Sequence, residues 1–219
     1  MDTCASDLFY ISFWFNFYWR KTGLSFDYIL PGILSMALMQ LGLFGALQFL
    51  SLRERKIVRG LSITPLSRGS ILSSEIFMRI LVGFVQTVII IIVGVTVFGF
   101  NLKGNLIQIF LVVLLGSLTF VSFGYMLICF VKSMEGGNGL AQIVQLLMMF
   151  LSGIFFPVDM MPDFMQPVVK IIPLTYLGDS LRQVMNGVPG RFSMTVNILV
   201  LSSWLFLSFI ITVRFWRWE

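Results

Sequence analysis

The side chains that usually carry out catalysis are scarce in this sequence. The 219 residues include no histidine, and the two cysteines, Cys4 and Cys129, lie far apart. This argues against imidazole acid–base chemistry, a zinc cluster and a disulfide framework. A phosphate-binding loop is also missing, because the run Gly136-Gly137-Asn138-Gly139 is not followed by lysine. We therefore predict that the chain is not an enzyme, hydrolyses no ATP alone and holds no cofactor of its own.

The composition predicts a membrane protein instead. Hydrophobic residues make up 58% of the chain and charged residues only 11%, with a mean hydropathy of +0.94. Soluble domains carry about a quarter of their residues as charges, and disordered chains carry far fewer large apolar side chains than the 23 phenylalanines and 13 methionines here. Both classes are excluded by these numbers.

Five nearly uncharged windows are long enough to cross a bilayer as helices. They run from Tyr28 to Leu50, Phe77 to Gly99, Leu106 to Val131, Asn138 to Phe156 and Met194 to Val213. The fold class is therefore predicted to be all-α, a polytopic helical membrane protein. Arg79, near the end of one window, is expected to pair with Glu75 at helical spacing. The other polar residues inside the windows are amides and hydroxyls, including Gln40, Gln142 and Thr119, which predict hydrogen bonds between helices rather than a proton relay.

The orientation follows from the most basic segment, Leu52 to Arg68. The positive-inside rule places this loop in the cytoplasm. The whole net charge of +5 then falls on the cytoplasmic side, together with the C-terminus. This predicts a multi-pass protein of the plasma membrane whose basic charge serves topology, with the lipid bilayer and not nucleic acid as its partner. Residues 1–25 are predicted to form an interfacial segment, since their apolar stretch is too short to span.

The basic loop contains a short amphipathic stretch. Ile57, Val58 and Leu61 share one helical face, the basic residues lie on the other, and Thr64-Pro65 ends the turn. Such a helix can dock on a protein. It can equally lie on anionic lipid headgroups.

Four prolines recur between the fourth and fifth windows, at positions 157, 162, 167 and 173, and they predict short helices separated by kinks. One stripe comprises Phe164, Met165, Val168, Val169 and Ile172. In the next helix, Leu177, Leu181 and Val184 are predicted to lie opposite Asp179, Arg182 and Gln183, with Gly187 as the C-cap. The pieces suggest a half-inserted hairpin that closes a pathway, or an ordinary interfacial loop.

From about Phe26 onward the sequence resembles the permease subunit of ABC type-2 exporters. The resemblance is carried by Leu30-Pro31-Gly32, by Arg53-Glu54-Arg55-Lys56 leading to Thr64-Pro65-Leu66-Ser67-Arg68, and by the segment from Leu151 to Pro157 followed by Pro173-Leu174-Thr175-Tyr176 and Leu181-Arg182. Residues 26–219 would then form the transmembrane domain of this family. The family usually has six spans, so the first of them is predicted to be missing here.

The resemblance implies which residues act. A coupling helix in the basic loop would contact a separate ATPase subunit, through Glu54, Arg55, Lys56, Ile57, Arg59, Leu61, Thr64, Pro65 and Arg68. Re-entrant helices outside the cell would close the exit, through Ser152, Gly153, Pro157, Pro162, Pro173, Tyr176 and Arg182.

The expected function is therefore that of a permease half. It would pair with a second copy or a sister permease, recruit cytoplasmic ATPase subunits that bind the ATP, and export an amphipathic substrate such as a drug, an antibiotic or a lipid-like molecule. The rival hypothesis is a membrane accessory or immunity protein that transports nothing.

Overall fold

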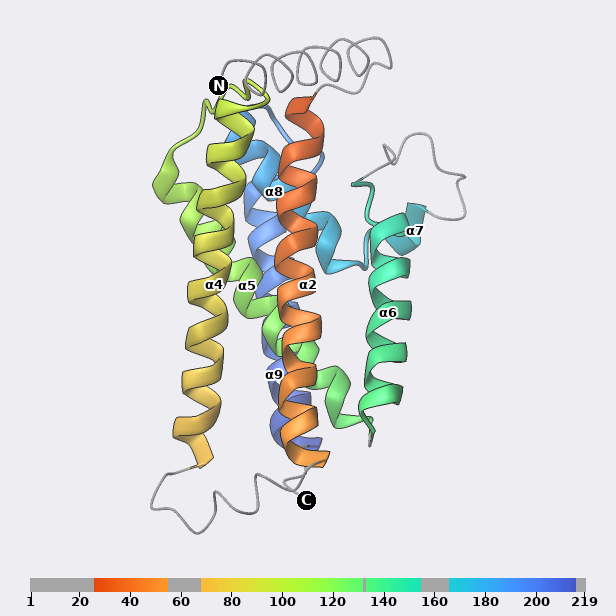
Figure 1. Ribbon diagram of the computed structural model, residues 1–219. Coiled ribbons are helices and arrows are strands. Elements are labelled where there is room, and N and C mark those ends of the chain that lie inside the picture. The colour runs from red at the N-terminus through yellow and green to blue at the C-terminus, as the bar shows by residue number, and fades with distance from the viewer. Residues whose placement is uncertain (1–25, 55–67, 132, 155–165, 216–219) are drawn as a thin grey trace, which may run out of the picture.

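The computed structural model describes residues 26–54, 68–131, 133–154 and 166–215, and every regular element in these ranges is a helix (Figure 1). The prediction of an all-α fold is confirmed. The helices are α2 (Phe26–Glu54), α4 (Arg68–Thr96), α5 (Leu106–Cys129), α6 (Met134–Leu151), α7 (Gln166–Val169), α8 (Pro173–Asn186) and α9 (Met194–Phe215). The predicted interfacial segment 1–25 lies outside the described residues.

Four helices in the described part of the chain are long and apolar enough to cross a membrane: α2, α4, α5 and α9. The remaining window, Asn138 to Phe156, corresponds to α6, which has 18 residues and is about 27 Å long. The helix begins four residues earlier than predicted, at Met134, and ends before Gly153, which has a positive φ of 74°. The window was therefore placed too far toward the C-terminus, because the apolar run continues past a backbone turn that hydropathy does not detect.

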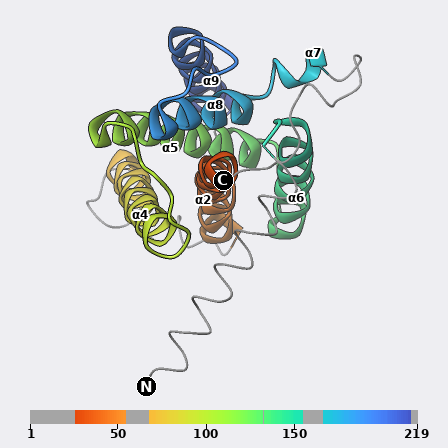
Figure 2. The ribbon, with the colours of Figure 1, turned by 90° about the horizontal axis from the view of Figure 1, so that it is seen from above.

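The bundle is organised around α5, which crosses it diagonally (Figures 1 and 2). Seen from above, α2, α4 and α6 lie on one side of α5, and α8 and α9 lie on the other. Glycines let α2 and α5 touch backbone to backbone: a Cβ on Gly42 would come 2.4 Å from the carbonyl carbon of Phe120, and one on Gly124 would come 2.3 Å from the oxygen of Gly42. No larger residue fits at either position without moving a helix.

The two ends of the bundle differ, and we name them by their contents. At the loop end, α2 ends, α4 begins and α6 begins (Figure 1). At the α8 end lie the start of α2, the starts of α5 and α9, and the whole of α8. Asn105 caps α5 by accepting a hydrogen bond from the amide of Ile107 at 2.9 Å.

The short helices near the prolines form as predicted, but α8 is more deeply buried than expected. Gly187 is its C-cap with a φ of 65°, which confirms that prediction. The apolar face is buried as predicted, yet Asp179 on the opposite side is only 7% exposed. The amphipathic pattern did not predict this burial, which arises because α8 packs on α2 and α5 and also on α9. Val168 is also exposed, while Val169 and Ile172 are buried.

Candidate functional site

The side chain of Arg182 joins three segments that are far apart in the sequence. Its guanidinium lies over the ring of Tyr28, 3.7 Å from the centroid. Nη2 donates to the carbonyls of Ile154 at 3.2 Å and Gly153 at 3.5 Å, and Nε donates to the carbonyl of Tyr28 at 3.5 Å. One cation on α8 thus connects the start of α2 with the turn that follows α6. We call Arg182, Tyr28, Gly153 and Ile154 the Arg182 latch.

The backbone of the latch requires glycine at two positions. The Tyr28 hydroxyl donates to the carbonyl of Gly153 at 2.8 Å, so this carbonyl accepts from two elements at once. Gly153 presents it from a left-handed conformation that glycine adopts without steric cost. A Cβ on Gly32 would stand 2.7 Å from Cγ2 of Ile154, so α2 reaches the turn only because residue 32 lacks a side chain.

The other predicted gate residues surround the latch or lie outside the described part. Ser152 is buried and donates to the carbonyl of Met149 at 3.4 Å. Pro173 occupies the first turn of α8, where its missing N–H costs nothing. Tyr176 donates to the carbonyl of Lys170 at 2.5 Å and packs on Phe192 with ring centroids 5.0 Å apart. Pro157 and Pro162 lie outside the described residues.

A second group at the α8 end was missed by the sequence analysis. The buried carboxylate of Asp179 accepts four hydrogen bonds: from the amides of Arg191 (2.9 Å) and Phe192 (3.1 Å), and from the side chains of Gln183 (2.9 Å) and Asn197 (2.9 Å). We call these five residues the Asp179 clasp. It holds the chain before α9 against α8. Its only signal in the sequence is a carboxylate four residues before an amide, which is too common to be informative.

Packing around the clasp is equally tight. Gln183 donates from the same nitrogen to the carbonyl of Phe192 at 2.8 Å, which fixes its amide between two acceptors. A Cβ on Gly190 would lie 2.2 Å from this nitrogen and 2.7 Å from the carboxylate. The carboxylate of Asp179 is therefore enclosed by four donors with no space left for a ligand, while Oδ1 of the clasp residue Asn197 is buried without a partner among the described residues.

The predicted coupling residues lie at the loop end, where the structure describes only the edges of the loop. Glu54, the last residue of α2, accepts a hydrogen bond from the amide of Met134 at 3.0 Å. This places a carboxylate at the start of α6, where the helix dipole favours negative charge. Arg68 begins α4. The remaining residues lie outside the described part: Arg55, Lys56, Ile57, Arg59, Leu61, Thr64 and Pro65.

A buried cation lies above this loop end. Arg79 is 6% exposed and pairs with Glu75, as its spacing predicts. It also reaches Gln48 on α2 at 3.5 Å, and its side chain packs where a Cβ on Gly45 would be. Nε of Arg79 has no hydrogen-bond partner among the described residues. We call Arg79, Glu75 and Gln48 the Arg79 cluster.

The predicted hydrogen bonds between helices are found for one of the three polar residues singled out above. Thr119 on α5 donates to the carbonyl of Leu201 on α9 at 3.3 Å, besides its bond within α5. Gln40 and Gln142 are instead exposed on α2 and α6. Their amides do not bond to another helix in the described part of the chain.

Comparison with known proteins identifies this architecture. Residues 20–214 match the family model described as "ABC-2 family transporter protein". The chain is 23% identical over 199 residues to the probable multidrug ABC transporter permease YbhS of Escherichia coli (strain K12), an alignment that covers 89% of this chain and 52% of that protein. It is 26% identical over 156 residues to the linearmycin resistance permease protein LnrN of Bacillus subtilis (strain 168), covering 71% of this chain and 40% of that protein.

The chain thus spans about half the length of the curated relatives that it matches. The family match, in contrast, extends from before α2 to the last turn of α9 and includes the Arg182 latch, the Asp179 clasp and the Arg79 cluster. This membrane-embedded, all-helical chain belongs to the ABC-2 family of transporter permeases.

Proposed function

We propose that the chain is the permease subunit of an ATP-driven exporter of amphipathic molecules, and that the loop end faces the cytoplasm. The named relatives, a probable multidrug permease and a linearmycin resistance permease, support a drug-like or antibiotic-like substrate. In this orientation α8 lies at the outer side of the plasma membrane, and the C-terminus lies inside.

The observation that carries the proposal is the distribution of amides on the exposed helix faces. Gln40 on α2, and Asn138 and Gln142 on α6, are exposed at positions within or beside the predicted membrane windows. Exposed hydroxyls on other helices bond to their own backbone, as Thr96 does to Ile92 and Ser203 to Leu199. An amide without a partner is costly in hydrocarbon.

The exposed faces of α4 and α9 consist mostly of aliphatic and aromatic side chains, whereas α6 exposes amides together with apolar residues such as Ile143 and Leu146. The faces of α4 and α9 suit lipid. The faces of α2 and α6 that carry amides suit a second permease copy or sister permease, with a polar pathway for the substrate between the two.

The proposed coupling runs from the loop through α2. The ATPase subunit would bind the basic loop. Glu54, the last residue of α2, leads into this loop and accepts a hydrogen bond from the amide of Met134 in α6. Helix α2 is continuous over 29 residues, about 44 Å, and carries Tyr28 of the Arg182 latch at its other end. A movement imposed at Glu54 would therefore reach the latch along one continuous helix, which contains Pro31 close to Tyr28.

Copurification with the nucleotide-binding subunit tests the coupling loop. The double variant Arg55→Glu/Arg59→Glu reverses two charges of the loop, and we expect it to lose the complex and the ATPase activity that depends on it. The matched control is Arg214→Glu, an exposed charge reversal at the same end of the bundle in α9. If the double variant binds and couples like the wild type, the docking assignment is wrong.

Transport in vesicles separates this proposal from a non-transporting accessory or immunity protein. Vesicles that contain the chain, its permease partner and the ATPase should accumulate a fluorescent amphipathic substrate only when ATP is present. Normal assembly without ATP-dependent flux for any amphipathic compound tested would favour the accessory role.

A further inference from the structure

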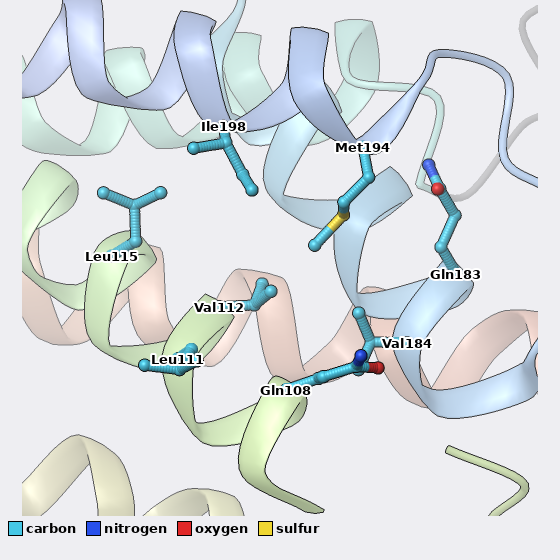
Figure 3. A pocket seen from close by; sticks show the side chains of 8 residues that line it. All are labelled: Gln108, Leu111, Val112, Leu115, Gln183, Val184, Met194 and Ile198. Carbon is cyan, nitrogen blue, oxygen red and sulfur yellow. The ribbon is translucent and has the colours of Figure 1, made fainter. Parts of the chain in front are cut away.

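A pocket opens between α5, α8 and α9 at the α8 end of the bundle (Figure 3). Its volume is about 540 Å³. The walls are lined by Leu111, Val112, Leu115, Val184, Met194 and Ile198, and two amides, Gln108 and Gln183, complete the lining. The pocket is separate from the Arg182 latch, since Tyr28, Gly153 and Ile154 do not line it.

The pocket lies at the depth of one membrane leaflet. Gln108 is in the first turn of α5, and Leu115 lies seven residues further, about 10 Å along the helix. Met194 and Ile198 occupy the first turns of α9, which is also long and apolar enough to span the bilayer. Leu111 and Ile198 are 60% and 42% exposed, so the pocket opens toward the surroundings of the bundle.

A lysine lies in the segment that packs on α8 next to the pocket residue Val184. The amide of Lys103 donates to the carbonyl of Met185 at 3.1 Å, directly beside the pocket residue Val184. A Cβ on the next residue, Gly104, would stand 1.5 Å from the carbonyl oxygen of Val184, so this segment is pressed onto α8. Lys103 is exposed and forms no salt bridge with another residue of the described ranges.

We propose that this pocket binds an anionic membrane phospholipid, with one acyl chain between α5 and α9 and the phosphate near Lys103. Apolar walls of this kind match a hydrocarbon chain, and an amide at the rim matches the ester and phosphate oxygens. The lysine favours a headgroup with net negative charge over a zwitterionic one. The inference does not depend on transport by this chain.

Binding at this site would stabilise the Asp179 clasp. Gln183 lines the pocket and at the same time donates to Asp179 and to the carbonyl of Phe192. Val184 follows it in α8. A bound acyl chain would therefore restrict both residues and hold the segment before α9 in place.

Lipid binding to the purified full-length chain tests the proposal. The chain is extracted in a mild detergent, titrated with phosphatidylglycerol or phosphatidylcholine, and examined by native mass spectrometry and thermal unfolding. We expect phosphatidylglycerol to remain bound at one molecule per chain, to raise the unfolding midpoint, and to bind more tightly than phosphatidylcholine.

Two variants with a matched control locate the site. Ile198→Trp places a larger side chain in the pocket. We expect it to displace about two methylene groups of the bound acyl chain, and this loss of buried surface should weaken phosphatidylglycerol binding roughly tenfold. Leu199→Trp places the same side chain on an exposed position of α9 that does not line the pocket, and it should bind like the wild type. Lys103→Gln should remove the preference for phosphatidylglycerol while leaving the binding of phosphatidylcholine unchanged.

Leu111→Trp, on the α5 wall, repeats the test if Ile198→Trp does not fold. Unchanged phosphatidylglycerol binding in a folded pocket-filling variant overturns the assignment of the site. An unchanged lipid preference in Lys103→Gln overturns the assignment of the headgroup. Displacement of the phospholipid by a transported amphipathic compound at equal affinity would identify the pocket as a substrate site, and would also overturn the proposal.

Discussion

Two buried charged side chains, Asp179 and Arg79, differ in how completely their surroundings satisfy them with hydrogen bonds. Asp179, at the α8 end, accepts four hydrogen bonds from α8, α9 and the segment between them. Arg79, at the loop end, pairs with Glu75 and reaches Gln48 at the limit of hydrogen bonding, while its Nε lacks a partner among the described residues.

The difference lies in how many hydrogen bonds hold each charge. Moving the Asp179 carboxylate leaves four donors unpaired, which is costly even though Oδ1 of Asn197 in the same clasp already lacks a partner among the described residues. The guanidinium of Arg79 has fewer bonds to lose when it exchanges partners. The Asp179 clasp is therefore suited to hold α8 and α9 together, and the Arg79 cluster is suited to respond to a movement of the neighbouring loop.

The largest expected effect is that of Asp179→Ala. The change leaves two backbone amides and the amide of Asn197 without their acceptor, while Gln183 keeps the carbonyl of Phe192. We expect it to lower the free energy of unfolding by on the order of 3 kcal/mol. Chemical denaturation in detergent measures this. Glu135→Ala, which removes an exposed carboxylate from the first turn of α6, serves as the control and should change stability by less than about 0.5 kcal/mol. If Asp179→Ala lowered the free energy of unfolding as little as Glu135→Ala does, the Asp179 clasp would not be the firmly held end of the bundle.

The second prediction concerns the turn of the Arg182 latch. Gly153→Ala forces a Cβ into a left-handed conformation and should cost about 1 to 2 kcal/mol. Gly139→Ala is the matched control, because a Cβ there meets nothing within 4 Å and the site is inside α6. We expect the control to be stabilising by about 0.5 to 1 kcal/mol. Thermal unfolding of both variants should thus move in opposite directions, and a shift of the same sign would contradict the geometry of the latch.

The third prediction addresses the Arg79 cluster. The double variant Glu75→Gln/Arg79→Met keeps most of the volume and removes both charges of the pair, so stability should remain within about 1 kcal/mol of the wild type. Coupling between the ATPase and the permease should fall about tenfold, since the ion pair and the contact with Gln48 are both lost. Measuring unfolding and substrate-stimulated ATPase activity on the same preparation separates the two effects. A loss of stability as large as that of Asp179→Ala would show that both charges are structural.

The smallest expected effect is that of Glu54→Gln. The amide still accepts from Met134 but removes the charge at the start of α6, and we expect a loss of about 0.5 kcal/mol that decreases at high salt. The comparison variant is Glu135→Gln, in the same turn of α6 without a recorded bond to α2. Unfolding at low and high ionic strength is the measurement, and an effect independent of salt would exclude the dipole explanation.

Local features of the fold could be predicted because their causes are local. Four of the five apolar windows correspond to helices long and apolar enough to cross a membrane. The four-residue spacing of Glu75 and Arg79 predicted their pairing, and Gly187 marked the end of α8. The end of α6 was less predictable, since Leu151 is followed by residues that are equally apolar and only the backbone of Gly153 turns the chain.

The candidate site could be predicted only in part, because its contacts join distant segments. Arg182 meets Tyr28 across 154 residues, and no periodicity indicates such a pair. Asp179 was assigned to the polar face of α8 because helical spacing describes one helix, whereas burial depends on what packs against both of its sides. The family resemblance did place Gly153 and Arg182 in one group, although without their geometry.

The contact between Gly42 and Gly124 lies near the middle of α2 and has a mechanical consequence. Because the backbones touch there without intervening side chains, the two helices cannot come closer at that point. If α2 tilted about this contact, its two ends, at Glu54 and Tyr28, would move in opposite directions. A tilt of this kind would widen one end of the bundle while narrowing the other.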